Sequence, residues 1–292
     1  MKRRNLPIFS CSIILALILV PGLFFGVTLK FVIMASQDSR IEMPKYKALA
    51  EYLKLKIPEI EDINLQIASD YPNAVELFKS GKADGMISGS FVAAVLIKKD
   101  LAVPVVRPVS TKGFSSYKAI IVAKKGTKKF KGIEDFKDKK VAYIELASAG
   151  EVFVRSLLAG KSPESLFIPV LVKKHQIAVN AVKAGEADYG VVKDLIFDPA
   201  IYPGIEIVGE DSGAEVNPND AIILNNQTYK TLGPKIESSL LSLEKDTSET
   251  AVNLKKIFDI NGYIKTTPES YTHTYGLMKK ALIDPKKFNF NF

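Results

Sequence analysis

Short apolar runs alternate with amphipathic segments along most of this chain, a pattern typical of α/β proteins. Residues 28–35 are almost continuously apolar, as expected of a buried strand in a parallel sheet. Further strands are expected at residues 63–67, 85–88, 103–109, 117–123, 140–145, 168–172, 189–192, 205–208 and 221–224. Because helical segments separate most of these strands, the order predicts parallel sheets with helices on both faces.

The helical segments are marked by apolar stripes and by proline or glycine at their ends. One helix is expected to begin at Pro44 and to end at Pro58, and others follow at residues 91–98 and after Gly150. Everything after Asn226 is expected to be helical, with ends near Gly233, Asn261-Gly262 and Pro268.

One stretch of the chain occurs twice. Residues 74–84 (AVELFKSGKAD) recur as residues 178–188 (AVNAVKAGEAD), at an offset of 104 residues and without a gap. Each copy predicts a short helix that ends at glycine, an Ala-Asp turn and a buried strand. The same offset pairs Tyr71 with His175 and Ser90 with Asp194. Chance similarity is the alternative, but the repeat favours two similar lobes that offer matched polar groups to a shared cleft.

We therefore expect an α/β fold of two similar lobes, each a mainly parallel sheet flanked by helices, joined by a hinge. The chain is expected to cross between the lobes near residues 115–117 and 217–220. The first lobe would comprise residues 27–116 and 220–292, and the second lobe residues 117–219. Residues 1–26 would form a signal peptide or an N-terminal anchor.

The N-terminus combines a basic segment, Lys2-Arg3-Arg4, with an apolar run over residues 13–25. This pattern is typical of a secretory signal, with cleavage near residues 20–22 or at Gly26. Neither site is a good small-x-small match, so an uncleaved anchor is the alternative, although the run is shorter than the ~20 residues that a span prefers. Cys11 precedes the apolar run, which argues against a lipid anchor. We expect a periplasmic or other extracytoplasmic protein that meets the membrane only through this segment, if it is uncleaved.

Composition narrows the function. The 292 residues are 47% hydrophobic and 25% charged, as in ordinary globular proteins, and carry a formal charge of +8. With two histidines and one cysteine, a metal centre has too few ligands. No nucleotide-binding, hydrolase or metalloprotease motif is found, nor a basic stretch interleaved with aromatic residues. We expect neither an enzyme, nor a cofactor, nor a nucleic-acid partner.

Two turns that join a strand to a helix are rich in small residues. Ala147-Ser148-Ala149-Gly150 leads into one helix, and Gly89-Ser90 leads into another. Free N–H groups at the start of a helix bind anions, although a serine there is more often a simple cap. Tyr71 and His175 can each donate a hydrogen bond to the same anion. Their alternatives are packing against the sheet for Tyr71 and a place on the surface for His175.

At these residues, from about Thr28 to Ala281, the sequence resembles the periplasmic binding proteins of phosphonate, phosphite and phosphate ABC transporters. The similar segments are Asp70-Tyr71 with Gly81-Lys82-Ala83-Asp84, residues 136–142, Ser148-Ala149-Gly150, His175, Pro218-Asn219-Asp220 and Gly262-Tyr263. The resemblance implies a bilobal binding fold in which Tyr71, Ser148 and His175 hold an oxyanion.

The chain departs from the family pattern at three places. Ala147 and Ala149 replace hydroxyl residues of the anion loop, Ser90 replaces a proline, and Ala93 replaces a tyrosine that contacts the ligand. These departures put the ligand, rather than the fold, in doubt.

Asp194 and Asp220 form a candidate acidic pair. The resemblance places them near positions that hold the amino group of aminoalkylphosphonates in some family members. A carboxylate near an anion site is costly unless a cation lies between them, so the ligand could be zwitterionic. The alternatives are that Asp194 caps a turn and that Asp220 belongs to the Asn-Pro-Asn turn.

The sequence thus predicts an exported protein that captures a small anionic or zwitterionic ligand and delivers it to the transmembrane subunits of an ABC permease. The alternative is a membrane-tethered sensory or accessory module that binds its ligand with the same fold. An enzyme on this fold lacks a nucleophile and a base at credible spacing.

Overall fold

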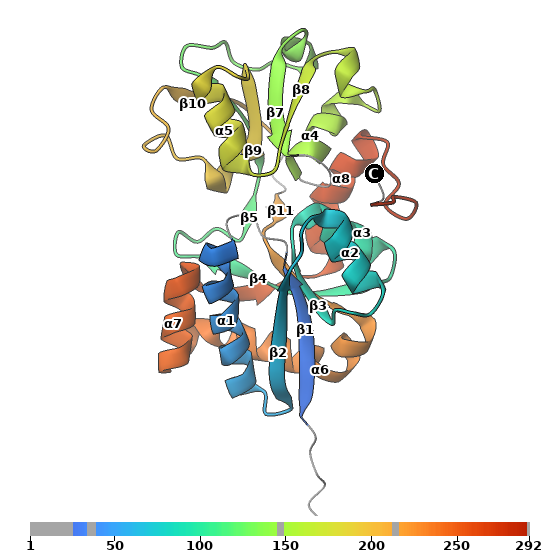
Figure 1. Ribbon diagram of the computed structural model, residues 1–292, viewed down its shortest axis with the longest axis vertical. Helices are drawn as coiled ribbons and strands as arrows, with labels where there is room; N and C mark the ends of the chain where they lie inside the picture. The colour runs from blue at the N-terminus through green and yellow to red at the C-terminus, as the bar shows by residue number, and fades with distance from the viewer. Residues whose placement is uncertain (1–25, 34–38, 145–148, 212–215, 291–292) are drawn as a thin grey trace, which may run out of the picture.

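The structure is a computed structural model that describes residues 26–33, 39–144, 149–211 and 216–290. Figure 1 shows two lobes stacked along the long axis, each built on one sheet. The lower one, here the six-stranded lobe, has the strand order β13-β4-β12-β3-β1-β2. The upper one, here the five-stranded lobe, has the order β10-β6-β9-β7-β8. The α/β fold with two similar lobes is therefore confirmed.

Helices cover both faces of the six-stranded sheet. Successive side chains of a strand point to opposite faces, so each strand contributes to an apolar cluster on either side. In β1, Leu29, Phe31 and Ile33 pack with α1, α6 and α7, whereas Val32 packs with α2 and α3. The strands are β1 (Val27–Ile33), β2 (Ile60–Ile67), β3 (Gly85–Ser88), β4 (Ala102–Ser110), β12 (Ala221–Asn225) and β13 (Ile260–Lys265). The helices are α1 (Ser39–Lys56), α2 (Tyr71–Lys79), α3 (Ser90–Lys98), α6 (Asn226–Leu241) and α7 (Glu249–Phe258), with a 3-10 turn at Leu243–Lys245.

The five-stranded sheet follows the same plan with one long helix on each face. Ile121 and Tyr143 pack with α4, whereas Ile120 and Val122 pack with α5. The strands are β6 (Ala119–Lys124), β7 (Lys140–Ile144), β8 (Ile168–Val172), β9 (Tyr189–Lys193) and β10 (Ile205–Glu210). The helices are α4 (Ala149–Leu158) and α5 (His175–Ala184), with 3-10 turns at Ile133–Phe136, Pro163–Ser165 and η3 (Asp194–Ile196).

A short antiparallel ribbon joins the lobes. β5 (Ser116–Tyr117) pairs with β11 (Asn217–Pro218), and the amide of Asn219 donates to the carbonyl of Ser115 over 3.1 Å. These are the two segments in which the sequence predicts the crossings, and we keep the predicted lobe boundaries as a proposal.

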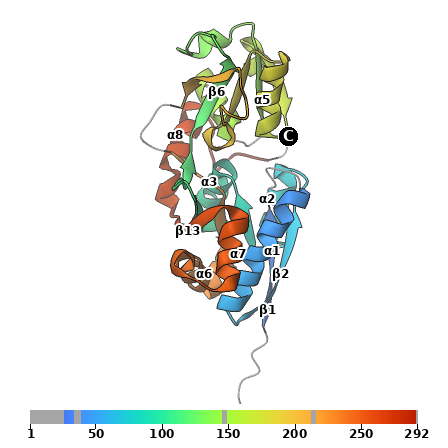
Figure 2. The same ribbon diagram turned by 90° about the vertical axis from the view of Figure 1, so that its left-hand side faces the viewer.

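The last helix, α8 (Thr272–Lys280), follows the 3-10 turn at Pro268–Tyr271 and lies at the level where the two lobes meet (Figure 2). It packs against α4 of the five-stranded lobe and α3 of the six-stranded lobe. Thr274 donates to the side-chain oxygen of Asn217 in β11 over 2.8 Å, and the Tyr275 hydroxyl donates to the carbonyl of Ala94 over 3.1 Å. The predicted boundaries place α8 in the first lobe, but its contacts lie in both.

The sheets are mixed rather than mainly parallel. β12 runs antiparallel to β3 and β4, and β6 runs antiparallel to β9 and β10. The reason is the hinge. β6 follows β5 and β12 follows β11, so each begins at the ribbon, whereas β9 and β3, with which they pair, end there. β6 and β12 must therefore run antiparallel to these neighbours. Crossing the hinge twice therefore requires antiparallel strands in both lobes.

The expectation of helix alone after Asn226 is wrong. Residues 260–265 form β13, which pairs antiparallel with β4. Gly262 ends no helix; it lets β13 pass close to Glu244, whose Cβ would lie 3.0 Å from a side chain added there. Gly233 and Pro234 lie inside α6. The low helix propensity of this Gly-Pro pair is outweighed by the burial of Leu232 and Ile236.

The repeat in the sequence is a repeat in hydrogen bonding. Gly81 and Gly185 both adopt a left-handed conformation, with φ of 70° and 80°, at the end of α2 and α5. The carboxylate of Asp84 accepts a hydrogen bond from the amide of Lys30 over 2.8 Å, and that of Asp188 accepts one from the amide of Lys140, also over 2.8 Å. Each repeated aspartate therefore fastens its helix–strand unit to a neighbouring parallel strand, in the middle of β1 for Asp84 and at the start of β7 for Asp188.

We expect Asp84→Ala to lower the free energy of unfolding by about 1–2 kcal/mol, because a hydrogen bond to a charged group is lost. Urea denaturation measures the change. Glu186→Ala, an exposed position in the second copy, is the control and should change stability by less than about 0.5 kcal/mol. Equal effects of the two substitutions would contradict the proposed role of the repeated aspartate.

Candidate ligand-binding cleft

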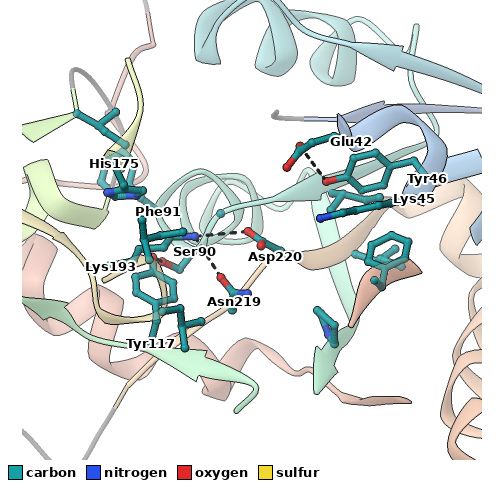
Figure 3. A pocket seen from close by; sticks show the side chains of 18 of the residues that line it. Glu42, Lys45, Tyr46, Ser90, Phe91, Tyr117, His175, Lys193, Asn219 and Asp220 are labelled. Atoms are coloured by element: carbon teal, nitrogen blue, oxygen red, sulfur yellow. Dashed lines mark hydrogen bonds and ion pairs between the residues drawn. The ribbon is translucent and has the colours of Figure 1, made fainter. Parts of the chain in front are cut away.

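A cavity of about 590 Å³ opens between the two sheets and the hinge ribbon (Figure 3). Tyr71 and Ser90 line it from the six-stranded lobe, His175 and Lys193 from the five-stranded lobe, and Tyr117 from the ribbon. Four of the residues predicted for the site, Tyr71, Ser90, His175 and Asp220, thus line one cavity.

Three helices begin at this cavity. Tyr71, Ser90 and His175 are the first residues of α2, α3 and α5, and all three line it. The partial positive charge at a helix N-terminus attracts anions. The backbone N–H groups at these helix starts therefore contribute a positive electrostatic potential to the cavity, in addition to the charges of its side chains.

His175 is buried, with 6% of its surface exposed, and its Nδ1 atom has no hydrogen-bond partner among the described residues. Burial, helped by the charge of Lys193, lowers its pKa to about 3. The ring is therefore neutral at physiological pH and can offer one N–H to a ligand. A buried polar atom without a partner is costly, so His175, which lines the cavity, is a candidate to bind a ligand.

The hydroxyl of Tyr71 is a second donor. Burial raises its pKa to about 12, with the ammonium of Lys193 acting in the opposite sense, so the hydroxyl keeps its proton at physiological pH. Tyr71 lines the cavity as the first residue of α2. Its counterpart by the repeat, His175, lies at the same position of the other lobe.

Ser90 has a partner that the sequence did not indicate. Its hydroxyl lies 2.5 Å from the hydroxyl of Tyr117, which is 1% exposed and comes from the hinge strand β5. Burial raises the pKa of Tyr117 as well. The pair joins the start of α3 to the hinge at the cavity wall.

Lys193 is the residue that sequence reasoning missed. Its side chain is 14% exposed, and its ammonium lies 3.1 Å from Oδ1 of Asn219, 3.5 Å from Oδ1 of Asp220 and 4.4 Å from the centre of the Tyr117 ring. Its charge acts on the pKa of both His175 and Tyr71, so it lies near both donors. The sequence feature that could have indicated it is its place at the end of β9, the strand that follows the second copy of the repeat.

The two candidate aspartates have different surroundings. Asp220 lines the cavity beside Lys193, in a left-handed conformation with φ of 43°. Asp194 does not line it: its carboxylate accepts from the amides of Lys118 and Leu195 over 3.1 and 2.8 Å. Asp194 therefore holds the start of η3, which is the turn-capping alternative considered for it.

The other predicted residues belong to the turn before α4. Ser148 lies outside the described residues. Ala149 and Gly150 are the first two residues of α4, and Gly150 is not among the residues that line the cavity. The predicted role of this turn as an anion loop therefore stays a prediction.

Neither a metal nor a membrane span is indicated by the described residues. They contain no group of three or more His, Cys, Asp or Glu side chains that could hold a metal ion. None of their helices combines the length and the apolar character needed to cross a bilayer. The segment predicted as signal or anchor lies mostly within residues 1–25, which are not described.

Comparison with known families settles the class of protein. The profile of the family described as the ABC transporter phosphonate periplasmic substrate-binding protein matches residues 31–271. The chain belongs to this family. The resemblance seen in the motifs is therefore confirmed, and the family is one of substrate-binding proteins. No curated protein matches the chain significantly.

Solved structures share the fold. XAC2383 from Xanthomonas citri bound to chloride has a TM-score of 0.72 at 14% identity, over 87% of this chain and 97% of that one. PhnD1 from Prochlorococcus marinus in complex with methylphosphonate has a TM-score of 0.70 at 14% identity, also over 87% and 97%. A phosphonate-transporter binding protein from Pseudomonas aeruginosa has a TM-score of 0.72 at 13% identity, over 88% of this chain and 87% of that one. At such identities these likenesses show the fold alone.

Burial of neutral His175 predicts a pH dependence of stability. Between pH 6.5 and about 3 the unfolded chain binds a proton at this residue and the folded chain does not, so stability falls as the pH is lowered through this range. One proton corresponds to a slope of about 1.4 kcal/mol per pH unit. We expect His175→Asn to reduce the slope measured by urea unfolding from pH 6.5 to 4.5 by up to this amount. Parallel curves for the two proteins would show that His175 is protonated in the folded state.

Proposed function

We propose that this protein is exported, binds a small oxyanion between its lobes and delivers it to the transmembrane subunits of an ABC permease. The observation that carries the proposal is the buried Nδ1 atom of His175 at the start of α5, which has no hydrogen-bond partner among the described residues; His175 lines the same cavity as Tyr71 and Lys193. Two uncharged donors and one cation suit an anion that exchanges its hydration shell for hydrogen bonds.

Each lobe supplies one of the uncharged donors, which gives the ligand a means to close the cleft. An oxyanion bound to His175 and Tyr71 bridges the five-stranded and six-stranded lobes. Only the closed form makes both sets of contacts, so ligand binding shifts the population towards it. The ribbon of β5 and β11 is the hinge in this proposal, and the closed form is what a permease would recognise.

The ion pair of Lys193 and Asp220 bears on the charge of the ligand. The sequence left open a zwitterion whose ammonium meets Asp220. In the structure the ammonium of Lys193 already lies 3.5 Å from this carboxylate. A ligand ammonium would compete with Lys193, so the pair favours a ligand that carries an anionic group and no amine.

The tethered sensory module differs from the transport protein in its N-terminus rather than in its cleft. The predicted cleavage positions make the difference measurable. N-terminal sequencing of the exported protein should find a new terminus between Leu23 and Lys30. An intact Met1 terminus on membrane-bound protein would favour the tether.

We expect His175→Ala and Tyr71→Phe each to weaken oxyanion binding about tenfold to hundredfold, because a hydrogen bond to a charged group contributes about 1.5–3 kcal/mol. Calorimetric titration with phosphate, phosphite, methylphosphonate and methylsulfonate measures the affinities. Lys183→Ala, an exposed substitution at the other end of α5, is the control and should bind like the unaltered protein. If none of the four anions binds to the unaltered protein, the oxyanion proposal is wrong.

A second test concerns the amine. The unaltered protein should bind ethylphosphonate at least about threefold more tightly than 2-aminoethylphosphonate, because Lys193 opposes a second ammonium. Lys193→Ala frees Asp220, so the ratio should move by about tenfold towards the amine. Lys173→Ala removes another lysine from the cavity lining and should leave the ratio unchanged. A preference for 2-aminoethylphosphonate in the unaltered protein would restore the zwitterionic ligand.

A further inference from the structure

The cavity extends well beyond the groups proposed to hold the oxyanion. Its volume of about 590 Å³ lies within the range of sites that bind drug-sized ligands, about 300–1,000 Å³. An oxyanion with one methyl group would occupy only a small part of it. The composition of the remaining wall therefore bears on the size of the natural ligand.

The rest of the wall is formed by a different set of elements from the six-stranded lobe. We call it the aromatic compartment; its apolar lining is Tyr46 of α1, Pro108 of β4, Phe258 at the end of α7, and Ile260 and Tyr263 of β13, and the charged residues Glu42, Lys45 and Asp259 also line the cavity beside it. Figure 3 places Tyr46 on the side of Asp220 away from His175. Because these elements belong to one lobe, hinge closure can cover the compartment but does not build or dismantle it.

This wall is held in place by packing among its own side chains. The rings of Tyr46 and Phe258 meet edge to face, with centres 5.6 Å apart and planes at 77°. Tyr46, Ile260 and Tyr263 are each less than a tenth exposed, and the hydroxyl of Tyr46 donates to Glu42 over 3.5 Å. A wall built in this way offers ring and aliphatic surface at fixed positions, which suits a flat or bulky apolar group.

Exposed apolar side chains stand at the same cavity from other segments. Phe114, between β4 and the hinge strand β5, is 54% exposed, and Leu195 of η3 in the five-stranded lobe is 39% exposed. Both line the cavity, as does Ile196. Burying these exposed apolar side chains against an apolar ligand group is favourable in free energy. Leu195 would approach the compartment from across the cleft.

We propose that the ligand is an oxyanion that carries an aromatic or similarly bulky apolar substituent, with its anionic end at His175 and Tyr71 and its substituent in the aromatic compartment. This inference rests on the proposed function, because it takes the oxyanion site as the other end of the same ligand. It assigns the cavity to organophosphonates, organophosphate monoesters or organosulfonates with a ring, rather than to phosphate or phosphite.

Calorimetric titration of the full-length protein with methylphosphonate and phenylphosphonate tests the inference, since the two share a head group and differ in the substituent. We expect phenylphosphonate to bind at least about tenfold more tightly, which corresponds to about 1.4 kcal/mol. Equal or weaker binding of phenylphosphonate would overturn the inference and leave the oxyanion function standing. If neither binds, and phosphate and methylsulfonate do not bind either, the proposed function fails instead.

Substitutions locate the substituent. Leu195→Ala should weaken phenylphosphonate binding about threefold or more and leave methylphosphonate binding unchanged, because it removes only apolar cover. Leu241→Ala is the matched control: Leu241 is 38% exposed on α6 and does not line the cavity. Phe258→Ala should remove most of the preference for the ring. A phenyl preference that survives both Leu195→Ala and Phe258→Ala would overturn the assignment to this compartment.

Discussion

Binding in this protein depends on one constraint: three helix N-termini and the largely buried ammonium of Lys193 meet at one cleft, whose lining also carries the carboxylates of Glu42, Asp70, Asp220 and Asp259. The starts of α2, α3 and α5 all face the cavity, and Lys193 lies among them. Among the described residues Asp220 is the carboxylate that pairs with this lysine, and its side chain is 44% exposed. In the proposed function an anionic ligand completes this arrangement, held by groups of both lobes.

Neutral His175 shows how the cleft limits its own charge. Burial, and after it the nearby charge of Lys193, disfavours the protonated ring and lowers the pKa of His175. The neutral ring still donates a hydrogen bond, so it contributes direction without further charge. Such a site discriminates by geometry as well as by charge.

The sequence predicted most of the fold because the repeated segment uses local signals that the structure also uses. Gly81 and Gly185 follow the ends of their helices, a signal that can be read locally, and Asp84 and Asp188 then fasten the following strands to β1 and β7. β13 was missed because its polar and glycine residues give it weak alternation, and it exists through pairing with β4. Strand direction likewise depends on the hinge crossings, which no local pattern records.

The site residues were likewise predicted where a local pattern marks them and missed where only long-range contacts do. Tyr71 and His175 were found because the repeat gives them matched positions at the starts of helices. Lys193 and Tyr117 were missed because their importance lies in contacts between segments far apart in sequence, such as Tyr117 with Ser90 and Lys193 with Asp220. Asp194 was included by its repeat position, but local backbone amides take its carboxylate. Equivalent positions in two lobes need not keep equivalent roles.

A crystal structure of the protein with a bound phosphonate tests the central claim most directly. The account predicts phosphonate oxygens within about 3.2 Å of Nδ1 of His175 and of the Tyr71 hydroxyl, with the lobes closed around them. A phosphonate held elsewhere, with His175 Nδ1 bonded to protein or water alone, would contradict it.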